Sequence, residues 1–148
     1  MHAELRERAL QSLIDAYVET MLWSSSDDGE VHLDQDHTSD DLSPEATAKV
    51  LADCTAFFEA HRETILAVER ERSDIGLGAK GRRPIPPATG PQSIWAQAGH
   101  DLWLTRCGHG CGFWDGDWPE DVGSALTAAA EALGELWPYV GDDGQIYL

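Results

Sequence analysis

Basic residues are scarce in this chain. Its 148 residues include 10 Lys and Arg against 27 Asp and Glu, which gives a formal net charge of −17. From residue 107 to residue 148 there are eight acidic residues and no Lys or Arg. Such a chain repels nucleic acid and anionic membranes, so we expect it to bind neither of them directly.

Cysteines and long apolar runs are also few. Three Cys, an odd number, cannot all pair with one another in disulfides. No apolar run approaches the roughly 20 residues of a membrane-spanning helix, and the first residues do not have the pattern of a signal peptide. We therefore expect a cytoplasmic protein, with a single domain over residues 1–148.

The first 72 residues are predicted to form two antiparallel helices. Apolar residues recur every three or four positions over residues 10–21, which is typical of an amphipathic helix. After a polar acidic loop, Ser43 is a predicted N-cap and Pro44 a first helical residue. The apolar spacing of this second helix continues to about Arg72.

Residues 73–93 are predicted to be a linker. They contain four Gly and four Pro, which oppose any regular element. They also contain the densest group of basic residues in the chain, Lys80, Arg82 and Arg83.

Residues 94–148 are predicted to combine helix and sheet. Leu102–Arg106 and Gly112–Trp114 flank a glycine-rich turn, which predicts a first hairpin. The apolar spacing of Pro119–Leu136 predicts a helix. Tyr139–Val140 and Ile146–Leu148, joined by an Asp-Asp-Gly turn, predict a second hairpin. The expected fold class is α+β, with two N-terminal helices and a C-terminal helix packed on a small antiparallel sheet of two hairpins.

The glycine-rich stretch Gly99–Asp115 is the most distinctive part of the chain, and two kinds of chemistry are possible there. Cys107, His109 and Cys111 are zinc-ligand types, but the alternating spacing differs from the usual ligand pairs, and we expect no metal.

The second possibility is acid–base chemistry by His100 and Asp101 together with His109, since a carboxylate can orient an imidazole for proton transfer. The structural alternative is that His100 and Asp101 tie the turn, and that Arg106 pairs with Asp115 across the hairpin.

The distribution of acidic residues is the more informative signal. They are not interspersed with basic residues as on an ordinary surface. Rows of carboxylates can imitate the phosphates of DNA, which repeat every ~3.4 Å along each strand. We therefore expect two partner-binding patches of acidic residues: a first group of Asp27, Asp28, Glu30, Asp34, Asp36, Asp40 and Asp41, and a second group of Asp115, Asp117, Glu120 and Asp121.

The stretch from Ala98 to Asp115, with Tyr139 to Tyr147, resembles a family of small acidic proteins of bacteriophages and mobile elements that carry a GHDxWLTRxGHGxGFWD motif. Two positions depart from the family pattern, because Cys107 stands where the family has Asn and Cys111 where it has a small apolar residue. These replacements argue against a zinc site common to the family.

Together these features predict a phage-encoded acidic inhibitor of a host nucleic-acid-targeting defence system, an anti-CRISPR or anti-restriction protein that acts as a DNA mimic in the host cytoplasm. The expected partner is a host defence protein or complex with a basic nucleic-acid-binding surface, and neither enzymatic activity nor a cofactor is expected. Two alternatives stay open: a metal-binding or catalytic protein centred on His100, Asp101 and His109, and a structural or accessory phage protein.

Overall fold

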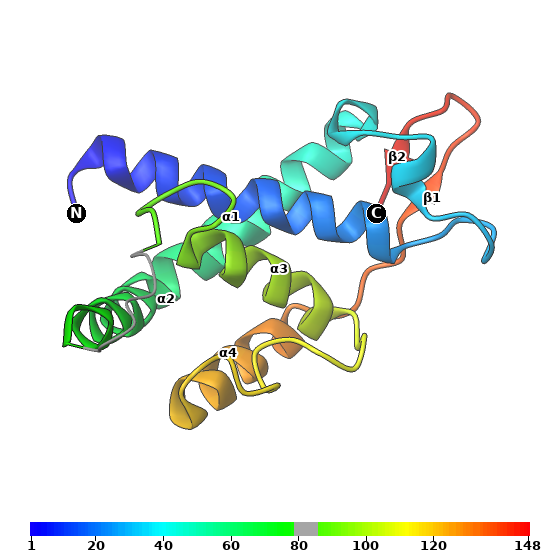
Figure 1. The fold of residues 1–148 in the computed structure, drawn as a ribbon. Helices are drawn as coiled ribbons and strands as arrows, with labels where there is room; N and C mark the ends of the chain where they lie inside the picture. The colour runs from blue at the N-terminus through cyan, green and yellow to red at the C-terminus, as the bar shows by residue number, and fades with distance from the viewer. Residues whose placement is uncertain (79–85) are drawn as a thin grey trace.

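The protein is mostly helical (Figure 1). A computed structural model of the chain describes residues 1–78 and 86–148. In that part of the chain the elements are α1 (Ala3–Ser24), the short 3-10 turns η1 (Leu33–Gln35) and η2 (Ser39–Asp41), α2 (Pro44–Gly78), α3 (Ile94–Arg106), α4 (Glu120–Ala132), β1 (Tyr139–Val140) and β2 (Ile146–Tyr147). None of these helices is both long enough and apolar enough to cross a bilayer.

The predicted α+β fold with two hairpins is wrong. Residues 102–106 form the second half of α3, and residues 112–114 lie in an irregular turn, so there is no first hairpin. The second hairpin is confirmed, since β1 and β2 pair antiparallel with Tyr139 opposite Tyr147. It is the one regular sheet within residues 1–78 and 86–148.

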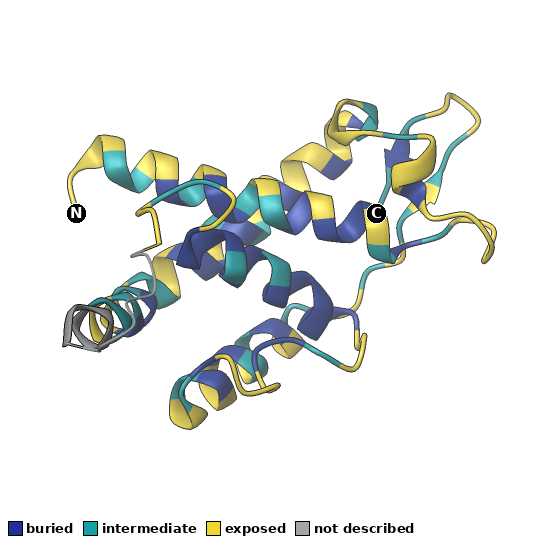
Figure 2. Cartoon of the chain, viewed as in Figure 1, coloured by how far each residue is buried: buried dark blue, intermediate teal, exposed yellow. Residues whose placement is uncertain are grey.

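Helix α3 is the centre of the core. It packs most extensively against α1 and also contacts α4 and α2 (Figure 1). Trp95 and Trp103 are among the largest fully buried side chains, and α3 is mostly dark blue in Figure 2. At Gly99 the two helices approach so closely that a Cβ atom would clash with the Leu13 carbonyl oxygen of α1. This glycine sets the distance between α1 and α3.

The two N-terminal helices are confirmed, and they run in opposite directions (Figure 1). Ser43 caps α2 as predicted, because its Oγ accepts a hydrogen bond of 3.0 Å from the backbone N–H of Ala46. Helix α2 continues past its predicted end near Arg72 to Gly78. Residues 79–85 of the predicted linker, with Lys80, Arg82 and Arg83, lie outside the described residues.

The C-terminal hairpin packs beside the start of α2. Leu42 and Ile146 form an isolated parallel bridge. The backbone N–H of Ser43 donates to the Ile146 carbonyl oxygen at 2.9 Å. Ile146 is fully buried, so this contact holds the loop that precedes α2 against the end of the chain.

Candidate functional site

Arg106, the last residue of α3, joins all four helices. Its guanidinium donates to the carbonyl oxygens of Leu133 and Gly134 after α4, to the Tyr17 hydroxyl on α1 and to the Asp53 carboxylate on α2, the last at 2.7 Å. The side chain is 1% exposed. The predicted pair of Arg106 with Asp115 is therefore wrong, because Arg106 is fully engaged in holding the helices together.

Two partners of Arg106, Asp53 and Tyr17, have pKa values that depart from the ordinary ones. Burial opposes ionisation of Asp53, but hydrogen bonds from Arg106 and Lys49 outweigh it and lower the pKa of the Asp53 carboxyl. Burial raises the pKa of the Tyr17 hydroxyl, so it stays protonated. In this cluster the charge of Arg106 is neutralised by Asp53. The cluster therefore has a structural role.

Asp101 connects α3 to the loop before α4. Its carboxylate accepts a hydrogen bond of 2.7 Å from Trp118 Nε1, and its other oxygen lies 3.0 Å from His100 Nδ1. Asp101 is buried, and burial raises the pKa of its carboxyl despite the hydrogen bonds from Trp118 and His100. The structure thus brings His100 and Asp101 together as predicted, on a helix rather than at a strand entry.

The rest of the glycine-rich motif folds back onto α3. Thr105 Oγ1 accepts a hydrogen bond of 3.1 Å from the Phe113 backbone N–H. A Cβ at Gly112 would clash with the same hydroxyl. Phe113 then stacks on Phe57 of α2, with ring centroids 5.7 Å apart. These contacts give most of the motif a role in the fold.

The cysteines and His109 do not gather into a site. Cys54 and Cys107 are buried, and burial raises the pKa of both thiols. His109 is exposed on the loop after α3 and does not line the cleft that contains His100. In the described residues, no three His, Cys, Asp or Glu side chains are arranged to hold a metal ion.

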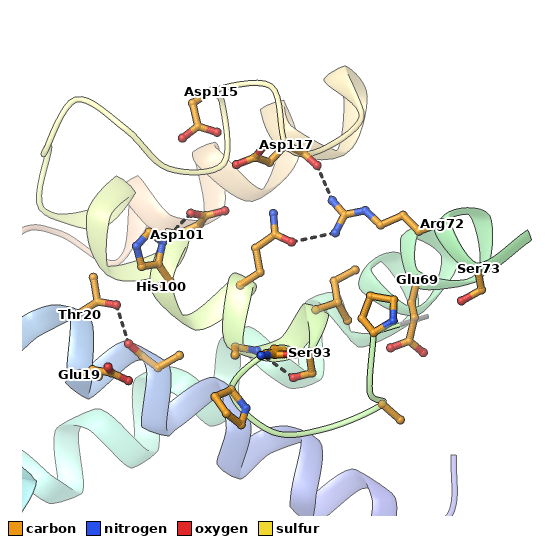
Figure 3. A pocket seen from close by; sticks show the side chains of 18 of the residues that line it. Glu19, Thr20, Glu69, Arg72, Ser73, Ser93, His100, Asp101, Asp115 and Asp117 are labelled. Carbon is orange, nitrogen blue, oxygen red and sulfur yellow. Dashed lines mark hydrogen bonds and ion pairs between the residues drawn. The ribbon is translucent and has the colours of Figure 1, made fainter. Parts of the chain in front are cut away.

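A cleft of about 630 Å³ opens beside His100 and Asp101 (Figure 3). Its walls come from α1, residues 69–73 of α2, the segment 86–93, the first half of α3 and the loop before α4. Five carboxylates line it, and they come from elements far apart in sequence: Glu19, Glu69, Asp101, Asp115 and Asp117. Burial raises the pKa of the Glu69 carboxyl, with a smaller opposing effect of Arg70.

Among the described residues that line the cleft, Arg72 is the one Lys or Arg. Its guanidinium donates to Gln97 Oε1 at 2.8 Å and to the Asp117 carbonyl oxygen, as Figure 3 shows. It also lies over the Trp118 ring, 5.2 Å from the ring centroid. Arg72 is thus engaged in closing one wall of the cleft, and the described lining residues include more carboxylates than basic groups.

Residues 27–41, which we call the acidic segment, contain all seven residues of the first acidic group and no Lys or Arg. Six of these seven carboxylate residues are exposed and Asp41 is half-buried. Figure 2 shows the segment largely in yellow, in the loop that joins α1 to α2. Its side chains therefore form an open surface.

Two carboxylates of the acidic segment fix its backbone. Asp28 accepts hydrogen bonds from the backbone N–H groups of Glu30 and Val31, and these bonds lower the pKa of its carboxyl. Asp41 accepts from the Thr38 backbone N–H at 2.8 Å in a capping box. The acidic segment is thus held in a defined shape by its own side chains.

No carboxylate of the acidic segment is in an ion pair with a basic side chain among residues 1–78 and 86–148. The ion pairs of that part join Arg6 and Arg62 with Glu59, Arg62 with Glu63, Lys49 and Arg106 with Asp53, and His100 with Asp101. Within the described part of the chain, no basic side chain therefore neutralises the charge of the segment.

The second acidic group lies apart from the first. Asp115 and Asp117 line the cleft, and Glu120 and Asp121 form the first turn of α4. In Figure 1 this region is below α3, whereas the acidic segment is at the right beside β2. The structure does not bring the two groups into one patch. Asp115 also accepts a hydrogen bond from the Gly112 backbone N–H, so it helps to shape its own loop.

The cleft contains residues that the sequence did not single out, among them Glu19, Glu69 and Arg72. Glu19 and Glu69 follow ordinary helical spacing, and nothing in the sequence distinguishes them from other exposed acids. Only Arg72 could have been singled out from the sequence, because it ends a run of charged residues at the predicted end of its helix. Their meeting depends on the packing of α2 against the loop before α4, which is a tertiary effect.

Comparison with known proteins gives no relative: no family model matches the chain, and no curated protein or solved structure matches it significantly.

Proposed function

We propose that the protein binds a basic, nucleic-acid-binding surface of a partner through its acidic segment, and that it thereby inhibits a host defence nuclease or CRISPR complex as a DNA mimic. The observation that carries the proposal is the absence, in the described residues, of any ion pair to the seven carboxylates of this segment. The phage origin rests on the sequence resemblance, and the defence target rests on that origin together with the excess of acidic residues.

Charge left without counter-charges has a cost, because like charges repel one another in the folded state. A basic partner surface would remove that cost and release bound counterions. The turns that Asp28 and Asp41 hold fix the direction of the neighbouring acids, so little conformational freedom is lost on binding. This arrangement favours fast, salt-sensitive association with a positively charged groove.

The direct test is a binding experiment with a neutralised acidic segment. The triple variant Asp34→Asn, Asp36→Asn, Asp40→Asn removes three charges and leaves the turn-forming Asp28 and Asp41 in place. The tagged wild type is used to capture proteins from host lysate at low salt, and proteins eluted by salt are identified. We expect a nuclease or CRISPR complex whose capture duplex DNA competes away and which the triple variant does not retain.

A matched control separates local charge from net charge. The control is a second triple variant that changes the total charge by the same amount at exposed helical positions outside the acidic segment: Glu7→Gln, Glu71→Gln and Glu131→Gln. This control is expected to retain the partner. Equal capture by the triple variant, or equal loss with the control, would refute a specific role of the acidic segment.

A second function is favoured by one observation, the pairing of His100 with the buried Asp101 at the wall of the cleft. We propose as the alternative that the cleft binds a small ligand, with Asp101 fixing the His100 ring so that Nε2 can accept a proton. Under this alternative His100→Gln abolishes the biological effect and the triple Asn variant keeps it. The reverse result supports the DNA-mimic function.

A further inference from the structure

A groove with an apolar floor lies between α1 and α2, next to the acidic segment. It encloses about 620 Å³, which is within the range of ligand-binding pockets. Its apolar lining comes from both helices and from the loop between them: Ile14, Val18, Leu22, Leu42, Val50 and Leu51. Leu51 is 53% exposed, whereas Val18, Leu22 and Val50 are buried.

One side of the rim of this groove is acidic, and the other side belongs to the acidic segment. Asp15 and Glu19 of α1 line it on one side. On the other side His37, Thr38 and Ser39 line it, and these residues lie between Asp36 and Asp40 of the acidic segment. No Lys or Arg is among the lining residues in the described part of the chain. The groove and the acidic segment are therefore one continuous surface.

We propose that this groove, which we call the α1–α2 groove, is the anchor site of that surface and receives apolar side chains of a basic partner segment. This inference rests on the proposed function and adds the chemistry of the partner. Charge complementarity selects the occupant: a segment with Leu, Ile or Met flanked by Lys or Arg fills the floor and pairs with the rim. An acidic occupant is repelled, and a second copy of this chain, at a net charge of −17, is disfavoured for the same reason.

The groove also explains how an acidic surface can select one basic partner. Surface ion pairs contribute little affinity each and weaken with salt. A buried apolar anchor contributes affinity that salt does not screen. The proposed surface therefore uses charge for encounter and the groove for retention.

The test uses two synthetic peptides of equal positive charge. The first is lysine-rich with leucines at helical spacing, and the second has Ser in place of each Leu. Binding to the full chain is measured by fluorescence anisotropy at low salt. We expect the leucine peptide to bind about tenfold or more tightly than the serine peptide. Equal affinities would overturn the proposal.

Variants of exposed residues locate the effect without disturbing the core. Leu51→Ser is expected to remove the preference for the leucine peptide. Val31→Ser, an exposed apolar residue of the acidic segment that does not line the groove, is the matched control and keeps the preference. A preference that survives Leu51→Ser would place the anchor elsewhere and contradict the proposal.

The two proposals fail in different ways. If the groove inference is wrong and the charge-based function is right, both peptides bind equally, and Asp34→Asn, Asp36→Asn, Asp40→Asn weakens both. If neither peptide binds at low salt, the charge-based function itself fails. Sedimentation of the free protein gives a further outcome, since a dimer that Leu51→Ser dissociates would show that a second copy occupies the groove and would overturn the proposed occupant.

Discussion

The motif Gly99–Asp115 and the acidic segment are both rich in polar residues, but the protein uses them in opposite ways. In the motif, Asp101 and Arg106 are buried and their polar groups have partners on other elements. In the acidic segment, the carboxylates are exposed or half-buried, and their hydrogen bonds stay within their own turns. The first arrangement stabilises the fold, whereas the second leaves the charge exposed on the surface.

This difference shows that a concentration of chemically versatile residues does not by itself indicate an active site. The motif's glycines and charged groups serve a close helix contact at Gly99 and an ion pair at Arg106. Substitutions in the motif should therefore have large effects on the free energy of unfolding, and substitutions in the acidic segment small ones.

The largest effect is expected at Arg106. Arg106→Met leaves Asp53 and the two backbone carbonyl oxygens of Leu133 and Gly134 without their buried donor, so we expect a loss of about 3–5 kcal/mol in the free energy of unfolding. Urea denaturation followed by tryptophan fluorescence measures it. Should this variant not fold, Asp53→Asn provides a milder measurement. Arg6→Met, which breaks the more exposed pair with Glu59, is the control, with an expected loss below about 1 kcal/mol. Similar losses in both would contradict the assigned role of Arg106.

The next effect is expected where α1 and α3 touch. Gly99→Ala places a methyl group against the Leu13 carbonyl oxygen, and forcing the helices apart should cost about 1–3 kcal/mol. Gly108→Ala tests backbone conformation alone, because Gly108 has a φ of +68° with open space around it, and about 1–2 kcal/mol is expected. Thermal unfolding of both variants makes the comparison. A Gly99→Ala variant as stable as the wild type would show that the helix contact is not close.

Asp101→Asn is expected to cost about 1–3 kcal/mol, because an amide oxygen cannot replace both acceptors for Trp118 and His100. The cost should depend on pH. Burial raises the pKa of the Asp101 carboxyl in the folded state. Protonation of this carboxyl therefore stabilises the fold as pH falls towards the ordinary Asp pKa of ~3.9. This stabilisation is lost as pH rises through the raised pKa. The difference in the free energy of unfolding between the wild type and Asp101→Asn should therefore grow as the pH is lowered. A difference that shrinks between pH 7 and pH 5 would contradict the burial effect.

The smallest effect on stability is expected in the acidic segment. Asp34→Asn, Asp36→Asn, Asp40→Asn removes exposed charges that repel one another, so the free energy of unfolding should change by no more than about 0.5 kcal/mol per site and in the stabilising direction. The gain should disappear at high salt, where the repulsion is screened. Chemical denaturation at low and high salt measures both. A marked loss of stability would show that these carboxylates serve the fold.

Local signals in the sequence were sufficient for the elements that depend on them. The Ser43–Pro44 start of α2 and the Asp-Asp-Gly turn between β1 and β2 were both predicted correctly, since a cap and a tight turn are determined within a few residues. The second half of α3, residues 102–106, was wrongly predicted to be a strand. Its residues are buried on nearly every side, so the apolar pattern has no period of 3.6 residues to indicate a helix.

The candidate sites also differ in how far the sequence alone predicts them. The acidic segment was visible in the sequence because its seven acids are close together between residues 27 and 41. The pairing of His100 with Asp101 was predicted because the residues are adjacent. The partners of Arg106 and the walls of the cleft were not predicted, since Glu69 and Asp117 meet only through packing of distant elements.

The measurement that tests the central claim most directly is the affinity of the salt-eluted partner for three proteins: the wild type, the triple Asn variant of the acidic segment, and His100→Gln in the cleft. We predict that the triple variant loses about a hundredfold or more in affinity at low salt, while His100→Gln binds as the wild type does. Full affinity of the triple variant together with loss in His100→Gln would contradict the account and assign the function to the cleft.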